Sequence, residues 1–294
     1  MEIWIAASLV AMIANVGKVL LVKTRCQHID SWQLVFYART ISAVVLCAAL
    51  IFVDYRIHDP GVFWGATSAA ALITIGASLL YLHAVKAGDL AIVTPLQATI
   101  PIFMLPGMYI LYGEIPRTQS LWFIGLIIAS VSVALYTSSR DQTRASHPTR
   151  LRAALASLAA AGLFGVSTVL DRVAIAAASN GALVFSAYWN LITVVMLLPM
   201  WFYLRKSAAP SPIRQPAVHY YVAAVLLAFI AQQYAVQFSL ELENGATYVK
   251  SIVMTHIVFA ALFGIVVLKE KVRPAVLIAS LMTVLGGVGL VWSI

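Results

Sequence analysis

Long apolar segments separated by short polar gaps run through the whole chain. A helix needs about 20 apolar residues to cross the hydrocarbon core of a bilayer. Ten segments of that kind can be marked, and their continuous apolar runs exclude a transmembrane β-barrel, whose strands alternate between apolar and polar positions. The predicted spans are 3–22, 31–53, 62–85, 90–112, 119–137, 152–175, 182–204, 218–240, 245–268 and 274–292.

The composition agrees with a membrane protein. Of the 294 residues, 62% are hydrophobic and only 10% are charged, whereas soluble domains carry about 25% charged residues. Ten spans use roughly 200 residues, which leaves short loops and no room for a soluble domain. The sequence therefore predicts an all-α polytopic membrane protein that lies in a lipid bilayer.

Two internal similarities divide the chain. Residues 88–117 resemble residues 244–273 at a shift of 156, and residues 36–52 resemble residues 187–202 at a shift of 151. Weak internal repeats of this kind are typical of transporters built from two related halves. We expect a first five-helix repeat over 1–139, a cytoplasmic linker over 140–150 and a second five-helix repeat over 151–294. The aligned pairs include Gly88 with Asn244, Glu114 with Glu270, Arg117 with Arg273, Tyr37 with Tyr188 and Arg39 with Asn190.

Basic residues give the predicted orientation. Thirteen Lys and Arg residues follow odd-numbered spans, and only Arg56, Arg117 and Arg172 are assigned to even-numbered loops. Because cytoplasmic loops concentrate Lys and Arg, the odd loops should be cytoplasmic and both termini outside. The same tendency explains the net charge of +8, so we expect no nucleic-acid partner. The bias inverts between the halves, which predicts ten transmembrane helices arranged as two inverted five-helix repeats.

On these features the chain resembles the drug/metabolite transporter superfamily, specifically its ten-helix EamA-type members. The resemblance implies a central cavity walled by both halves, alternating access by rocking, and export or exchange of small metabolites, often amino acids. It rests on the five-plus-five layout, the Gly88-Asp89 and Asn244-Gly245 loops, the Glu114 and Glu270 turns, and the glycines Gly125, Gly286, Gly287 and Gly289 in the last helix of each half.

Cationic side chains inside the spans are the first candidates for substrate binding. A charge near the middle of a bilayer costs roughly 2.5–3.5 kcal/mol on insertion scales, so it usually faces a cavity or a partner. Arg39 can hold a carboxylate or phosphate, or form a structural ion pair. Lys250 can read an anionic group, or pair with Glu241 or Glu243. His256 lies near the middle of its span, where it suits either proton coupling or an interhelical hydrogen bond.

Polar and aromatic side chains within the spans extend this set. Pro95 and Pro101 flank Gln97 and should kink its helix, which exposes carbonyl groups to a cavity. The glutamines of span eight can bind a substrate or bond to a neighbouring helix, and tyrosines can line an aromatic wall. The full set of predicted substrate-binding residues is Arg39, Tyr81, Gln97, Tyr188, Asn190, Gln233, Gln237, Lys250, Thr255 and His256.

Acidic residues are expected only at helix ends or in loops, where Glu114 and Glu270 should stabilise helix starts and form ion pairs. Lys18, with Asn15 one turn earlier, is expected to reach the membrane surface rather than line the cavity. No phosphate-binding loop, zinc-ligand spacing or nucleophile motif is found. We therefore predict no enzyme activity, no cofactor and no metal, and transport driven by protons or a counter-substrate.

The leading functional hypothesis is a carrier of small polar or amphipathic metabolites in the bacterial inner membrane, an amino-acid exporter above all. An exchanger of phosphorylated metabolites or nucleotide sugars is the alternative within transport. A non-transporting membrane scaffold and an intramembrane enzyme are the alternatives of another class. The sequence leaves open whether the protein is a monomer or a homodimer.

Overall fold

The computed structural model describes residues 3–113, 118–139, 147–204, 215–240, 249, 252–270 and 274–292. Regular structure in these ranges is helical, apart from one isolated antiparallel bridge between Ile57 and Ala178. The helices are α1 (Ile3–Thr24), α2 (Ser31–Leu50), α3 (Pro60–Ala87), α4 (Leu90–Val93), η1 (Pro95–Thr99), α5 (Ile100–Tyr112), α6 (Thr118–Ser139), α7 (His147–Ala176), α8 (Gly181–Leu204), α9 (Pro216–Phe238), α11 (His256–Val266) and α12 (Pro274–Trp292).

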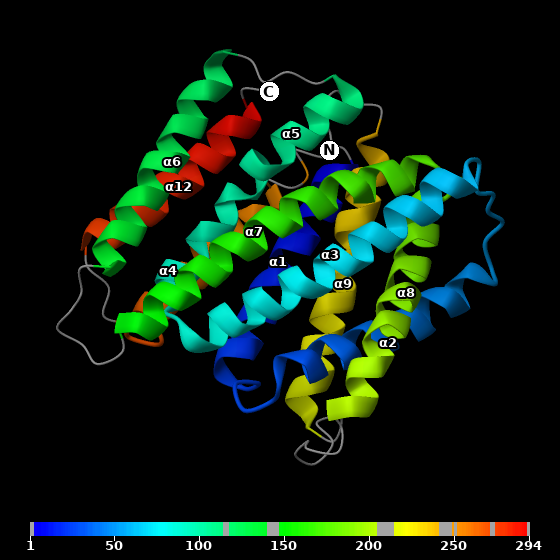
Figure 1. Ribbon diagram of the computed structural model, residues 1–294, viewed down its shortest axis with the longest axis horizontal. Coiled ribbons are helices and arrows are strands. Elements are labelled where there is room, and N and C mark those ends of the chain that lie inside the picture. Colours follow the sequence, from blue (N-terminus) through cyan, green and yellow to red (C-terminus); the bar gives the residue numbers. More distant parts are fainter. Residues whose placement is uncertain are drawn as a thin grey trace.

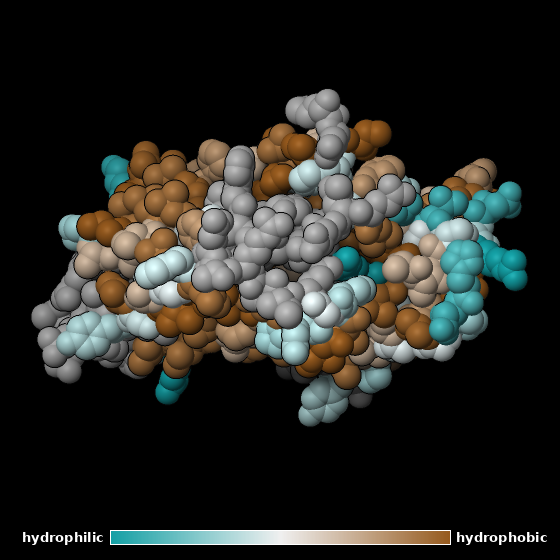
Figure 2. Space-filling model, turned by 90° about the horizontal axis from the view of Figure 1, so that it is seen from above, coloured by the Kyte–Doolittle hydropathy of each residue, from teal (hydrophilic) through white to brown (hydrophobic). Residues whose placement is uncertain are grey.

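Seven helical segments in the described part of the chain are long and apolar enough to cross a membrane, and three shorter apolar helices accompany them. Their outward side chains are also apolar: Phe52 is 86% exposed, and Trp122 is 80% exposed. Figure 2 shows hydrophobic side chains over most of the coloured part of the face in view, while hydrophilic ones gather at the end where Figure 1 places the loop between α2 and α3. The chain is thus a helical multi-pass membrane protein, as predicted.

Four helix pairs make the most extensive contacts of the bundle (Figure 1): α3 with α7, α1 with α9, α2 with α8, and α6 with α12. Each pair joins a helix of the first half of the chain to a helix of the second. The buried residues between them are mainly small alanines and branched aliphatic side chains, which let helices approach closely. The two halves are therefore interleaved rather than lying side by side.

Two of the predicted spans are interrupted near their middles. The span that begins at Leu90 changes from α4 to the 3₁₀ turn η1 before it continues as α5, which confirms the kink predicted from Pro95 and Pro101. The span that ends at Val266 is interrupted by a turn at Thr255, directly before α11. Each interruption places backbone that is not α-helical in the interior of the bundle.

The molecule has two ends that we name for use below. The basic face is where α1 ends, α2 begins and α3 ends, and it carries Lys23, Arg25 and Lys86. The opposite face is where α2 ends and α3 and α8 begin. At the basic face, Lys23 Nζ donates to the carbonyl oxygen of Gly88 over 2.5 Å. At the opposite face, the residues that follow α2 bond to residues 177–180, which follow α7.

Glu270 ties the end of α11 to the start of α4. Its two carboxylate oxygens accept hydrogen bonds from the backbone N–H groups of Leu90 and Ala91, at 2.9 and 3.0 Å. A carboxylate at this position satisfies free N–H groups and interacts favourably with the helix dipole. Gly264 makes the approach possible, because an added Cβ there would lie 2.6 Å from a carboxylate oxygen of Glu270. Glu270 thus stabilises a helix start, as predicted, whereas its expected ion-pair partner Arg273 and the residue Glu114 lie outside the described residues.

Candidate substrate-binding cavity

A cavity of about 120 Å³ lies among the middle parts of α1, α2, α3, η1, α7, α8, α9 and the segment before α11. A water molecule needs roughly 10–15 Å³ on the same measure, so the space suits a small organic molecule. The lining comes from both halves of the chain. It consists of Asn15, Lys18, Arg39, Thr74, Tyr81, Gln97, Ile100, Phe164, Ser167, Thr168, Asp171, Trp189, Val225, Ala228, Phe229, Gln232, Gln233, Val253, Met254 and His256.

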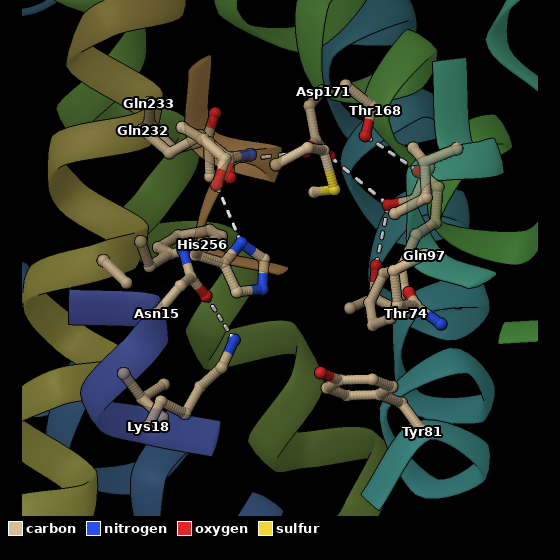
Figure 3. Close-up of a pocket in the computed structure, with 18 of the residues that line it drawn as sticks. Asn15, Lys18, Thr74, Tyr81, Gln97, Thr168, Asp171, Gln232, Gln233 and His256 are labelled. Atoms are coloured by element: carbon tan, nitrogen blue, oxygen red, sulfur yellow. Dashed lines mark hydrogen bonds between the residues drawn. The ribbon is translucent and has the colours of Figure 1, made fainter. Parts of the chain in front are cut away.

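The charged groups of the cavity are separated (Figure 3). Asp171, Gln232 and Gln233 gather at one end, whereas Lys18 and Tyr81 lie at the other. Lys18 precedes the end of α1 at the basic face, and Asp171 precedes the end of α7 at the opposite face. The cavity is therefore positive toward the basic face and negative toward the opposite face.

Arg39 lies in α2 and forms part of the cavity wall. Its guanidinium carbon is 4.4 Å from the centre of the Trp189 ring and 5.3 Å from that of Phe229, so the two rings hold the cation by cation–π attraction. Its Nη1 donates to Oδ1 of Asn190 over 3.4 Å, a long hydrogen bond. The arrangement fixes the guanidinium against an aromatic wall while its planar donor groups remain suited to a carboxylate.

Asp171 is the acidic residue of the cavity, and its side chain is 8% exposed. Ser167 donates to its Oδ1 and Gln233 donates to its Oδ2, over 3.5 and 3.4 Å. Ser167 also shares a 2.7 Å hydrogen bond with Thr74 on α3. The expectation that acidic residues lie only at helix ends or in loops is therefore wrong for Asp171, because α7 continues for five residues beyond it to Ala176.

Gln233 lies beside Asp171 and is fully buried. Its Nε2 faces the Asp171 carboxylate, which only accepts hydrogen bonds, so the orientation of the amide is determined. Its Oε1 has no hydrogen-bond partner among the described residues. An acceptor without a partner in a buried site is costly, and a ligand that donates a hydrogen bond would satisfy it.

Lys18 and Tyr81 form the end toward the basic face. Lys18 Nζ donates to Oδ1 of Asn15 over 2.5 Å, and both residues line the cavity. The expectation that Lys18 extends to the membrane surface is therefore wrong: it is held inward by the side chain one turn earlier. The Tyr81 hydroxyl is buried and has no hydrogen-bond partner among the described residues, so it too is available to a ligand.

His256 begins α11, and Gln97 lies in η1, so both interrupted helices contribute a polar side chain to the cavity. The Nδ1 atom of His256 lies 2.7 Å from the carbonyl oxygen of Val253. A carbonyl accepts only, so Nδ1 carries a proton, and Figure 3 shows the other ring nitrogen toward the cavity. Gln97 Nε2 instead donates to the backbone and hydroxyl oxygens of Ser157, at 2.7 and 2.9 Å.

Five of the predicted residues thus line the cavity, and four others do not. Tyr188 shares a 2.6 Å hydrogen bond with Tyr55, and Asn190 donates to the carbonyl oxygen of Ser186. Gln237 accepts from the backbone N–H of Ala182 at the start of α8, and Thr255 donates to the carbonyl oxygen of Ile252. Lys250, the remaining predicted residue, lies outside the described residues.

Four of the lining residues that were not predicted share a pattern in the sequence. Phe164, Ser167, Thr168 and Asp171 follow the spacing i, i+3, i+4 and i+7, which places them on one face of α7. That face was overlooked because Arg172 was assigned to a loop. Arg172 is in fact buried within α7, where its guanidinium carbon lies 4.1 Å from the centre of the Tyr112 ring.

Within the described residues, no group of three or more His, Cys, Asp and Glu side chains is placed to hold a metal ion. The polar groups of the cavity are amides, hydroxyls, an imidazole and separated charges, which bind a ligand through hydrogen bonds and ion pairs.

The comparisons identify the class of protein that has this arrangement. Residues 2–136 match the EamA-like transporter family. A crystal structure of a protein that is 18% identical aligns over 98% of both chains with a TM-score of 0.65, which shows a shared fold. No curated protein sequence matches the chain. Residues 2–136 are thus similar to the EamA-like transporter family, which is part of the drug/metabolite transporter superfamily.

Proposed function

We propose that the protein is a secondary transporter that moves small polar or amphipathic metabolites, amino acids and related compounds above all, across the bacterial inner membrane. The observation that carries the proposal is the cavity itself. It lies at mid-length of the helices, is lined by amides, hydroxyls and separated charges, and draws its walls from both halves of the chain. Polar groups buried within membrane helices at this depth are costly, and they usually mark a pathway for a substrate.

The architecture we propose is ten transmembrane helices in two inverted five-helix repeats, 1–139 and 151–294, joined by a cytoplasmic linker at 140–150. The helix contacts support it. If α1 corresponds to α7 and α3 to α9, the contact of α3 with α7 and that of α1 with α9 become equivalent under a twofold axis, and α2 with α8 and α6 with α12 lie on that axis. Two interrupted helices at corresponding positions are a feature of such transporters.

Alternating access follows from this architecture. Contacts between the two halves occur at both faces. At the basic face, Nε2 of His28 lies 2.8 Å from Oε1 of Gln215. At the opposite face, the backbone N–H of Arg56 donates a hydrogen bond to the hydroxyl of Ser179. Rocking of one repeat against the other would separate one set of contacts while the other stays closed. The basic face is the cytoplasmic one by its Lys and Arg residues, and net export is the direction we propose.

The charges in the cavity favour amino acids over phosphorylated compounds. A phosphate ester or nucleotide sugar brings two or more negative charges, and the buried carboxylate of Asp171 would repel them. A zwitterion brings one charge of each sign and meets a partner for both. We therefore place the exchanger of phosphorylated metabolites second.

The direct test is counterflow in liposomes reconstituted with the purified protein. Liposomes are loaded with an unlabelled compound, and uptake of the same labelled compound is followed for a panel of amino acids, amines, sugar phosphates and nucleotide sugars. We expect saturable counterflow of at least one amino acid. Counterflow of sugar phosphates alone would establish the exchanger of phosphorylated metabolites. If no compound of the panel exchanges faster than in liposomes without protein, the transport function is contradicted and a membrane scaffold is favoured.

A further inference from the structure

We infer that the cavity recognises its substrate as a zwitterion held in one orientation, with the ammonium group at Asp171 and Gln233 and the carboxylate at Arg39. This inference rests on the proposed transport function, because it concerns how the same cavity selects its substrate. It names Asp171, which the sequence did not indicate, as the residue that distinguishes amino acids from simple carboxylic acids.

The end near the opposite face presents acceptors. The carboxylate of Asp171 is 8% exposed and lines the cavity, and the buried amide of Gln233 lies next to it. Because Gln233 uses its Nε2 on Asp171, its Oε1 remains an acceptor with no partner among the described residues. An ammonium group carries three N–H donors and a positive charge, so it satisfies the carboxylate and the amide oxygen together.

The middle of the cavity and the end near the basic face present donors. Arg39 offers a planar set of N–H groups, and Trp189, on which it lies, has an Nε1 donor with no partner among the described residues. The Tyr81 hydroxyl and the ammonium group of Lys18 line the same cavity, at the end away from Asp171 (Figure 3). A carboxylate accepts from several such donors at once, and an arginine can bind it through two parallel hydrogen bonds.

The two sets of groups line one small cavity. Arg39 and Asp171 both belong to its continuous lining. A zwitterion placed between them satisfies both, with its ammonium group toward the opposite face. A simple carboxylic acid would leave Asp171 without its ammonium partner, and a simple amine would face Arg39 and Lys18, so both should bind more weakly.

The experiment compares matched triads of ligands by isothermal titration calorimetry on the detergent-purified full chain. The triads are L-alanine, propionate and ethylamine; L-leucine, 4-methylpentanoate and 3-methylbutylamine; and L-phenylalanine, 3-phenylpropionate and phenethylamine. We expect at least one amino acid to bind about tenfold or more tightly than both of its analogues, because a site built for a polar group rejects a ligand that lacks it.

Substitutions then assign each end. In Asp171→Asn, the preference for the amino acid over its carboxylic acid should fall to near unity, while the preference over the amine persists. In Arg39→Gln, the preference over the amine should fall to near unity, while the preference over the carboxylic acid persists. Arg172→Gln is the matched control, because it removes a buried arginine that packs on Tyr112 rather than lining the cavity; both preferences should survive in it. Gln233→Leu, which leaves the charge of Asp171 in place, should weaken only the ammonium preference.

The outcomes separate this inference from the transport function. If an amino acid binds and both preferences are unchanged in Asp171→Asn, or in Gln233→Leu should Asp171→Asn not fold, the assignment is overturned. If the wild-type protein binds carboxylic acids or amines as tightly as amino acids and still shows counterflow, the inferred recognition of a zwitterion is wrong and the proposed transport function is retained. If no compound gives counterflow in liposomes, the proposed function itself has failed.

Discussion

The two interrupted helices break at threonines 156 positions apart, Thr99 and Thr255, yet they are held in different ways. In both, the threonine hydroxyl donates to the carbonyl oxygen three residues earlier, over 2.7 Å. A local bond of this kind offers the backbone an alternative to the α-helical ladder. The same chemistry therefore produces a break at aligned positions of the 156-residue shift found in the sequence.

The surroundings of the two breaks differ. The first follows Pro95 and is fastened to α7 by the two hydrogen bonds from Gln97 to Ser157. The second contains no proline at the break. His256 bonds there to Val253, and the Thr255 hydroxyl also lies 2.8 Å from the Met12 sulfur on α1, a weak acceptor. We infer that the first break is a fixed wall of the cavity, and that the second is the one that changes shape when substrate moves.

Gln97→Leu should have the largest effect. It removes two buried hydrogen bonds and leaves the oxygens of Ser157 without their donor, which should cost roughly 2–4 kcal/mol of unfolding free energy and greatly reduce transport. Thermal unfolding of the purified protein measures the loss. Gln232→Leu, the same change at a half-buried lining residue, is the control. Equal unfolding temperatures for the two variants would contradict a fixed first break.

Glu270→Ala should have the next largest effect on stability. It leaves the N–H groups of Leu90 and Ala91 without the carboxylate that now accepts from them. Loss of a helix cap costs about 1 kcal/mol, and thermal unfolding can detect it. Glu270→Gln keeps an acceptor and should lose less. If the alanine variant unfolds at the wild-type temperature, Glu270 does not support the first interrupted helix.

His256→Phe should reduce transport more than stability, which is the opposite balance from Gln97→Leu. The substitution keeps an aromatic ring but removes both nitrogens, the one that faces the cavity and Nδ1, which donates to the carbonyl oxygen of Val253 within the same segment. We expect the KM of counterflow to rise about fivefold, the equivalent of one hydrogen bond, with a small change in unfolding temperature. His256→Gln, which restores a polar group, should recover part of the affinity. A large fall in unfolding temperature with unchanged KM would assign His256 to packing.

The threonines themselves should give the smallest effects. Thr99→Val and Thr255→Val each remove one hydroxyl hydrogen bond, at a cost of about 0.5–1.5 kcal/mol. We expect similar losses of stability and a larger loss of transport rate for Thr255→Val, because that break is the one we expect to move. Paired measurements of unfolding temperature and counterflow rate decide this. The reverse order of rates would exchange the roles of the two helices.

Hydropathy predicted the helical membrane fold well, because the apolar segments are long and their ends carry polar residues. The break in the first interrupted helix could also be predicted, since Pro95 and Pro101 cannot support an uninterrupted α-helical ladder. The break at Thr255 has no such local signal. Only the alignment of the two halves places it opposite Thr99, and that alignment does not show which residues leave the helix.

The cavity could be predicted only in part. Arg39, Gln97 and His256 were found because a polar side chain within a span needs a partner, but the same reasoning selected Asn190 and Gln237, which bond to the backbone of α8. The sequence does not show which face of a helix meets the cavity. Asp171 was overlooked because a charged residue near a span end was taken to mark that end.

Alternating exposure of the cavity is the central claim, and one accessibility measurement tests it most directly. Cys26 and Cys47 are replaced by alanine, and Ala228, a small buried residue of the cavity wall, is replaced by cysteine. A membrane-impermeant thiol reagent is then applied to one side or the other of oriented vesicles. We predict reaction from both sides, slowed by the substrate that counterflow identifies. Reaction from one side only, or at a rate that substrate leaves unchanged, would contradict the account.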